Sequence, residues 1–192
     1  MRSIRIEAAA CLWWAALLLL LPLKWLIAAF LAGVFHEFCH YLAIRAAGGN
    51  VYGFLIRPAG AVMATSPLTP GKELCCALAG PVGGLALLLF ARWLPLVALC
   101  GLVQSAFNLL PIFPLDGGRA LRCAVMLLAP RKDPEGICRV LGWICLMGLL
   151  GLILLAAHCF SWGCGVLLPM AVLVCRFFPG KRPCKTGRLA LQ

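Results

Sequence analysis

Residues 25–47 read WLIAAFLAGVFHEFCHYLAIRAA, a strongly apolar run with the pattern HEFCH at residues 36–40. Residues four apart lie on one face of a helix, so His36 and His40 would reach the same metal ion. Glu37 is turned by about 100° from His36 and would address a water molecule on that ion. Two hydrogen-bonded core histidines are the alternative. Because ionisable groups within an apolar span are costly to bury without a metal, we favour a metal site with Glu37 as general base.

A catalytic zinc site usually has three protein ligands and one open position. Asp116 is the only other carboxylate at a plausible depth, and it lies in the stretch NLLPIFPLDGGR at residues 108–119. Pro111 and Pro114 break a helix there, and irregular backbone within a membrane is tolerated only beside protein or a water-filled cavity. Cys39, the other candidate ligand, would point to a different side of its helix. The predicted ligands of one zinc ion are therefore His36, His40 and Asp116.

The depths of these ligands along their spans do not match if both helices are straight. His36 and His40 would lie about 16 and about 22 Å into a helix that begins near residue 25. Asp116 would lie about 33 Å along a straight helix that begins at Leu94 and runs in the same direction. We expect a tilt or kink at the two prolines to absorb the remaining difference of roughly 10 Å.

The composition is typical of a protein whose solvent is lipid. Hydrophobic residues make up 64% of the 192 positions and charged residues only 12%, against about a quarter in soluble domains. No Asp, Glu, Lys or Arg lies between Arg92 and Asp116, or between Arg139 and Arg176. A span needs about 20 apolar residues, which predicts an all-α polytopic membrane protein. The six predicted transmembrane helices cover residues 8–23, 25–47, 73–92, 94–115, 137–157 and 161–178. A cleaved signal peptide is the alternative for the first of them.

The distribution of basic residues predicts the orientation in the membrane. If both termini are cytoplasmic, 15 of the 17 Lys and Arg residues face the cytoplasm, and only Lys24 and Arg92 face outside. Positive residues concentrate on the cytoplasmic side of membrane proteins. The net charge of +11 then meets anionic lipid headgroups, so we expect the lipid bilayer and no nucleic acid as a partner. The active site would lie towards the cytoplasmic side.

Residues 1–192 are expected to form one membrane domain with a basic tail at residues 179–192. The segment 48–72 is rich in Gly and Pro, and its part from Val51 to Met63 alternates in a way that predicts a small β-hairpin between the second and third helices. The third span contains AGPVGG at residues 79–84, small residues that let helices pack closely in lipid.

Two further groups of residues receive structural interpretations. Arg119 and Arg122 are interpreted as anchors of an interfacial helix. Most of the twelve cysteines lie within apolar spans, where a thiol behaves as a small apolar side chain. Cys159 and Cys164 are the exception, because a predicted external loop would allow them to form a disulfide.

The two motifs together resemble the site-2 protease family of intramembrane zinc metalloproteases, in which an HExxH helix precedes an N-x-x-P-x-x-P-L-D-G motif. The resemblance covers about residues 25–130, the expected catalytic core. It implies hydrolysis of peptide bonds in membrane-embedded or membrane-associated regulatory proteins. Within this resemblance Asn108 would bind the substrate backbone or the developing oxyanion, although a contact between helices remains its alternative role. Gly84 stands where the family often has Asn.

A narrower resemblance involves residues 56–63, which are similar to the sporulation-type branch of the family. In that branch a membrane protease activates a sigma-factor precursor. This resemblance implies a bacterial plasma membrane and a regulatory membrane partner.

Two other functions fit the same residues less well. A metal transporter or channel would need a polar path on both sides of the ion, but no charged residue serves an outer half-pathway. An inactive homologue that only binds substrates would have no need of Glu37 as a base.

Overall fold

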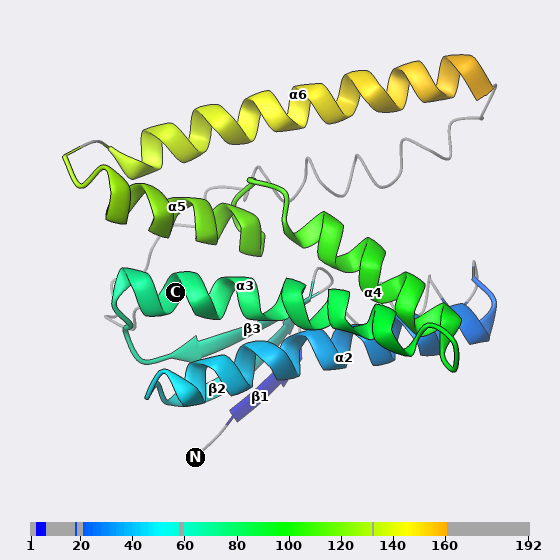
Figure 1. Cartoon of the computed structure of the whole chain (residues 1–192), viewed down its shortest axis with the longest axis horizontal. Helices are drawn as coiled ribbons and strands as arrows, with labels where there is room; N and C mark the ends of the chain where they lie inside the picture. Colours follow the sequence, from blue (N-terminus) through cyan, green and yellow to red (C-terminus); the bar gives the residue numbers. More distant parts are fainter. Residues whose placement is uncertain (1–2, 7–17, 19–20, 58–59, 132, 161–192) are drawn as a thin grey trace.

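The computed structural model describes residues 3–6, 18, 21–57, 60–131 and 133–160. Within them, α2, α3 and α4 pack against one another, and α5 lies between α3 and α6 (Figure 1). In chain order the elements are β1 (Ser3–Ile6), α2 (Leu23–Ala46), β2 (Val51–Arg57), β3 (Gly60–Thr65), α3 (Pro70–Ala86), the 3-10 helix η1 (Leu87–Phe90), α4 (Pro95–Asn108), α5 (Asp116–Leu128) and α6 (Pro134–Phe160).

Three helical segments in the described part of the chain are long and apolar enough to cross a membrane. They are Leu23–Ala46, Pro70–Phe90 and Pro134–Leu152, and they coincide with the second, third and fifth predicted spans. Large apolar side chains such as Phe30, Leu89 and Ile144 are exposed on them, which is the arrangement expected for a protein surrounded by lipid. The chain is thus an integral membrane protein. Most of the predicted span 8–23 lies outside the described residues. The predicted span 161–178, the tail at 179–192 and Cys164 lie outside them entirely.

The helix of the fourth predicted span, residues 94–115, is broken near the two prolines, as predicted, but it ends earlier than a kinked helix would. Helix α4 ends at Asn108 after 14 residues, about 21 Å of helix, and residues 109–115 form a loop. The reason is that Pro111 and Pro114 lack the backbone N–H that a continuing helix requires.

The core of the helix bundle follows one face of α2. Its buried residues recur at every fourth position, which is the spacing of a single helical face, and the small residues among them allow close approach. The members of this face are Ala28, Ala32, His36, His40 and Ile44. Both histidines of the predicted motif therefore lie inside the bundle rather than against lipid.

Helix α3 approaches α2 and α4 closely because three of its positions lack a side chain. A Cβ at Gly80 would overlap the imidazole of His40, one at Gly83 would overlap Cys39 Sγ, and one at Gly84 would overlap Ser105 Oγ. The helix continues through Pro81, whose side chain is fully buried. The AGPVGG segment is thus a packing surface, as the sequence predicted.

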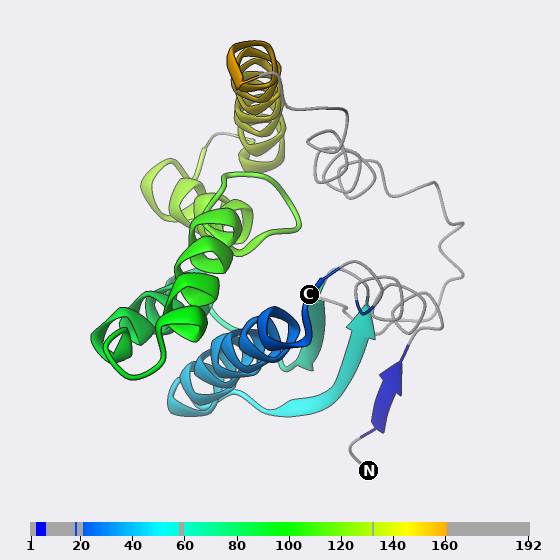
Figure 2. The same cartoon turned by 90° about the vertical axis from the view of Figure 1, so that its right-hand side faces the viewer.

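The predicted hairpin is present and belongs to a three-stranded sheet. Strands β2 and β3 are antiparallel, with Phe54 opposite Met63. Strand β1 pairs in parallel with β2, so that Ser3 lies opposite Gly53, and the strand order is β1-β2-β3. Strand β1 was not predicted from the sequence. The sheet lies beside α2 in both views (Figures 1 and 2).

Hydrogen bonds connect the C-terminal end of α2 to the N-terminal end of α3, the two ends that are predicted to face the cytoplasm. Gly48 has a φ of 82°, the left-handed conformation that often ends a helix. Lys72 Nζ donates to the carbonyl of Ala47 at 2.8 Å, and Arg45 donates to Asn50 Oδ1 at 3.0 Å. These bonds fix the start of β2 relative to both helices.

Seven cysteines whose side chains the structure describes are free, in agreement with their interpretation as small apolar side chains; they are Cys39, Cys75, Cys76, Cys100, Cys123, Cys138 and Cys145. Cys123 in α5 is an example, because its burial raises the pKa of the thiol to about 11 and keeps it neutral at physiological pH.

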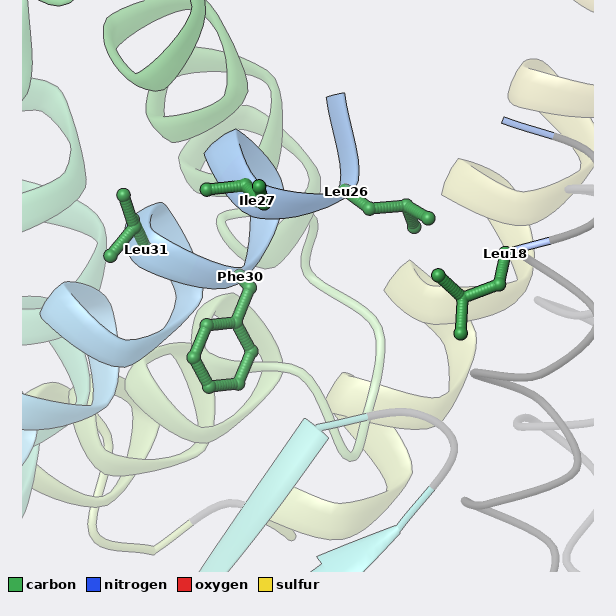
Figure 3. Close-up of a pocket in the computed structure, with 5 residues that line it drawn as sticks. All are labelled: Leu18, Leu26, Ile27, Phe30 and Leu31. Carbon is green, nitrogen blue, oxygen red and sulfur yellow. The ribbon is translucent and has the colours of Figure 1, made fainter. Parts of the chain in front are cut away.

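An apolar hollow lies beside the first half of α2 (Figure 3). It is lined by Leu18, Leu26, Ile27, Phe30 and Leu31. The described side chains that line it are all apolar, and it lies apart from His36, His40 and Asp116.

We predict that Gly84→Ala destabilises the protein by about 1–3 kcal/mol, since the new methyl group overlaps Ser105 Oγ in a fully buried contact. Adding Ser105→Ala should restore part of the lost stability, because the Ser105 Cβ is 3.6 Å from the new methyl, whereas the Gly101 carbonyl oxygen stays 3.2 Å from it. Thermal unfolding in detergent measures both variants. Gly148→Ala is the control, since nothing lies within 4 Å of its Cβ. A double variant no more stable than Gly84→Ala alone would contradict this packing.

Candidate metal site

His36 and His40 lie one turn apart on the buried face of α2. Their exposed fractions are 2% and 7%, and their ring centroids are 4.8 Å apart. Both rings turn their Nε2 atoms toward the same point, because these two atoms are 3.2 Å from each other. The spacing of four residues in the motif therefore produces the shared face that the sequence predicted.

A hydrogen bond on the side of the ring away from the site fixes the orientation of the His40 imidazole. Its Nδ1 lies 2.7 Å from the backbone carbonyl of Cys76, and since a carbonyl only accepts, Nδ1 carries the proton. In the neutral ring Nε2 then has a free lone pair that points into the site. Gly80 provides the space for this ring. His36 differs, because its buried Nδ1 makes no hydrogen bond to a described residue.

Asp116 reaches the histidines because the loop 109–115 folds back before α5 begins. A Cβ at Gly117 would overlap the Leu109 carbonyl, and one at Gly118 would lie 2.6 Å from the Ile112 carbonyl carbon, so both glycines allow the loop to pack on the first turn of α5. Ile112 is 1% exposed and anchors the loop in a core cluster with Leu115 and Leu146. The expected depth mismatch of roughly 10 Å is thus resolved by the loop rather than by a kinked helix.

Three lone-pair-bearing atoms meet at this point. Asp116 Oδ2 is 3.1 Å from His36 Nε2 and 3.1 Å from His40 Nε2. With His40 Nε2 unprotonated, a single proton on His36 cannot satisfy all three contacts, whereas a cation can. A tetrahedral zinc ion with bonds of about 2.0 Å separates its ligand atoms by about 3.3 Å, which is close to the observed spacing. These residues therefore fit a metal ion, and they are the only such group of three in the part of the chain that the structure describes.

The carboxylate of Asp116 is ready to bind a cation without first losing a proton. Burial alone would raise the pKa of its carboxyl, but the histidine rings in their protonated form, a positive charge that a metal ion would replace, hold this pKa well below the usual range. Asp116 also stands at the first position of α5, where the helix dipole favours a negative charge.

The other predicted site residues are not part of this group of three. Glu37 is half-buried and acts electrostatically on His40. Asn108 is the last residue of α4 and is half-buried. Cys39 packs against Gly83 of α3, which excludes it from the group of three.

Two supports of the site were missed by the sequence analysis. The carbonyl of Cys76 carries no sequence signal, because any residue offers one. Gly80 was visible as a small residue in the AGPVGG segment, but its partner was not, since no pattern in one sequence pairs position 80 with position 40.

We predict that Asp116→Asn lowers metal affinity by more than about 100-fold, because losing a ligand should cost at least as much as losing a residue that supports one. Cys39→Ala is the matched control and should retain the metal, since its side chain packs on α3 instead. Metal analysis of the purified variants after dialysis measures the difference. Stoichiometric metal in Asp116→Asn together with loss in Cys39→Ala would mean that the ligand set is different.

Comparison with known proteins places this geometry in context. No protein-family model matches the chain. A zinc metalloprotease of Methanocaldococcus jannaschii is 30% identical over 125 residues, a match that covers 58% of this chain and 34%, about a third, of that relative. The solved structure of a site-2 protease from the same organism superposes with a TM-score of 0.67 and 22% identity, covering 96% of this chain and 93% of that one. This chain therefore has the site-2 protease fold, and the resemblance to that family predicted from its two motifs is confirmed.

Proposed function

We propose that this protein is an intramembrane zinc metalloprotease that hydrolyses peptide bonds of membrane-embedded or membrane-associated regulatory proteins. The observation that carries the proposal is the meeting of His36 Nε2, His40 Nε2 and Asp116 Oδ2 within 3.2 Å inside a lipid-exposed helix bundle. We assign one zinc ion per chain to these three ligands. Zinc bound there would polarise a scissile carbonyl and lower the pKa of a bound water.

Three further residues of the chain have roles in the proposed reaction. Glu37 accepts the proton of the attacking water and passes it to the leaving amine, as a general base that becomes a general acid. The Cys76 carbonyl keeps the Nε2 lone pair of His40 aimed into the site. Asn108, at the end of α4, hydrogen-bonds the substrate backbone or the developing oxyanion.

The small sheet offers a place for an unwound substrate. A helical substrate protects its peptide bonds, so it must extend before cleavage. In the order β1-β2-β3, β2 is paired on both sides, so among the described strands the outer edges of the sheet belong to β1 and β3, and β3 is the edge strand of the hairpin. We infer that an extended substrate segment adds to this edge through main-chain hydrogen bonds.

The proposed orientation places both termini and the active site towards the cytoplasm. Its support is the position of basic residues at one end of the bundle, where Arg45 and Lys72 bind the turn after α2. Positive residues of this kind are retained on the cytoplasmic side and attract anionic lipid. The catalytic core would comprise residues 25–130 of a single domain. The sporulation-type branch, its regulatory partner and its bacterial membrane stay predictions from residues 56–63.

We predict that Glu37→Gln retains zinc but lowers cleavage by at least about 100-fold, because the general base is lost while the ligands remain. The measurement is co-expression with candidate single-span substrates, with Cys39→Ala as an active control. Turnover near the wild-type level in Glu37→Gln would rule out the base. Zinc flux into proteoliposomes without cleavage would favour a transporter instead.

Reporter fusions test the orientation. Fusions at Lys72, Lys132 and Gln192 should read cytoplasmic, and those at Arg92 and Ser161 external, because 15 of 17 basic residues then face inward. An external signal at Gln192 would show that the number of spans differs from six or that the first is cleaved.

A further inference from the structure

The two oxygens of the Asp116 carboxylate face different partners. Oδ2 lies 3.1 Å from both histidines, whereas Oδ1 lies 4.0 Å from Nη1 of Arg119, one turn further along α5. A carboxylate that is free to rotate can present either oxygen or both to a cation. A charge held beside Oδ1 favours the rotamer in which Oδ2 alone enters the site.

The guanidinium of Arg119 also forms an ion pair with a residue of another helix. Its Nη2 lies 3.8 Å from Oε1 of Glu73, in the first turn of α3. The Glu73 side chain is only 12% exposed and that of Arg119 is 33% exposed, so this pair is screened less than a surface ion pair. One planar guanidinium with two N–H ends thus joins two carboxylates from two helices.

A second arginine on α5 provides a comparison. Arg122 is exposed to a similar degree, 35%, and pairs with Glu135 at 4.0 Å, but Glu135 is 70% exposed. Both arginines link α5 to a neighbouring helix, yet only Arg119 also pairs with a residue of the candidate metal site. A role limited to fixing α5 would therefore be shared by both arginines, and a role in the site would be specific to Arg119.

We propose that Arg119, held by Glu73, is a positioning residue that keeps Oδ1 of Asp116 engaged so that Oδ2 alone is directed between His36 and His40. This role replaces the interpretation of Arg119 as a simple interfacial anchor. It rests on the proposed metal site and not on the proposed proteolysis. Residues that orient a ligand in this way typically change metal affinity by about 10- to 100-fold when they are removed.

The test is zinc affinity, measured by chelator competition on the full chain in detergent, together with the unfolding temperature of each metal-free variant. Arg119→Gln and Glu73→Gln should each bind zinc about 10- to 100-fold more weakly than the wild type. Arg119→Lys should lie between, because an ammonium keeps the charge but cannot bridge both carboxylates. Arg122→Gln is the matched control and should stay within about twofold of the wild type, outside the range expected for a supporting residue.

A double variant separates positioning from helix docking. Glu73→Leu with Arg119→Met replaces the ion pair by apolar contact, which often preserves packing. If Arg119 orients Asp116, this variant regains the unfolding temperature of the metal-free wild type but still binds zinc weakly. Wild-type zinc affinity in the double variant, or in Arg119→Gln, would overturn the proposal. Absence of zinc binding in the wild type would instead refute the metal site itself.

Discussion

Three polar side-chain atoms, from His36, His40 and Asp116, lie close together inside a bundle that exposes large apolar side chains. Burying a polar group without a partner costs about 2–7 kcal/mol, so these atoms must be satisfied together. The arrangement constrains the surrounding helices. Helix α3 has to approach α2 at Gly80 to accommodate the His40 ring, and the loop 109–115 has to fold back to deliver Asp116. The packing of α2, α3 and α5 therefore holds the side chains of His36, His40 and Asp116 together.

Sequence patterns predicted those features that depend on local spacing. The HEFCH pattern placed two imidazoles on one face, and the Gly- and Pro-rich segment after it predicted the hairpin of β2 and β3. The apolar run of α2 and the absence of charge in much of the chain predicted a membrane protein. Each of these predictions follows from a period or a local composition, which a single sequence contains in full.

Features that depend on contacts between distant segments were not predictable. Strand β1 pairs with a strand about 50 positions later. Its residues SIRI alternate between polar and apolar, but a stretch of four residues does not indicate which distant strand it will pair with. The path of the chain from Asn108 to Asp116 was expected to be a kinked helix, because the prolines show where a helix breaks but not where the chain goes next. Arg119 has the appearance of any interfacial arginine until Glu73 and Asp116 are placed beside it.

The span of sequence between the ligands has a consequence for the life of the protein in the cell. Asp116 is 76 residues from His40 and 80 from His36, so an ion bound by all three would close a large loop. Such a closure removes conformations mainly from the unfolded chain, much as a covalent cross-link does. The stability of the folded chain would then depend on the supply of metal, and a chelator would favour the unfolded state.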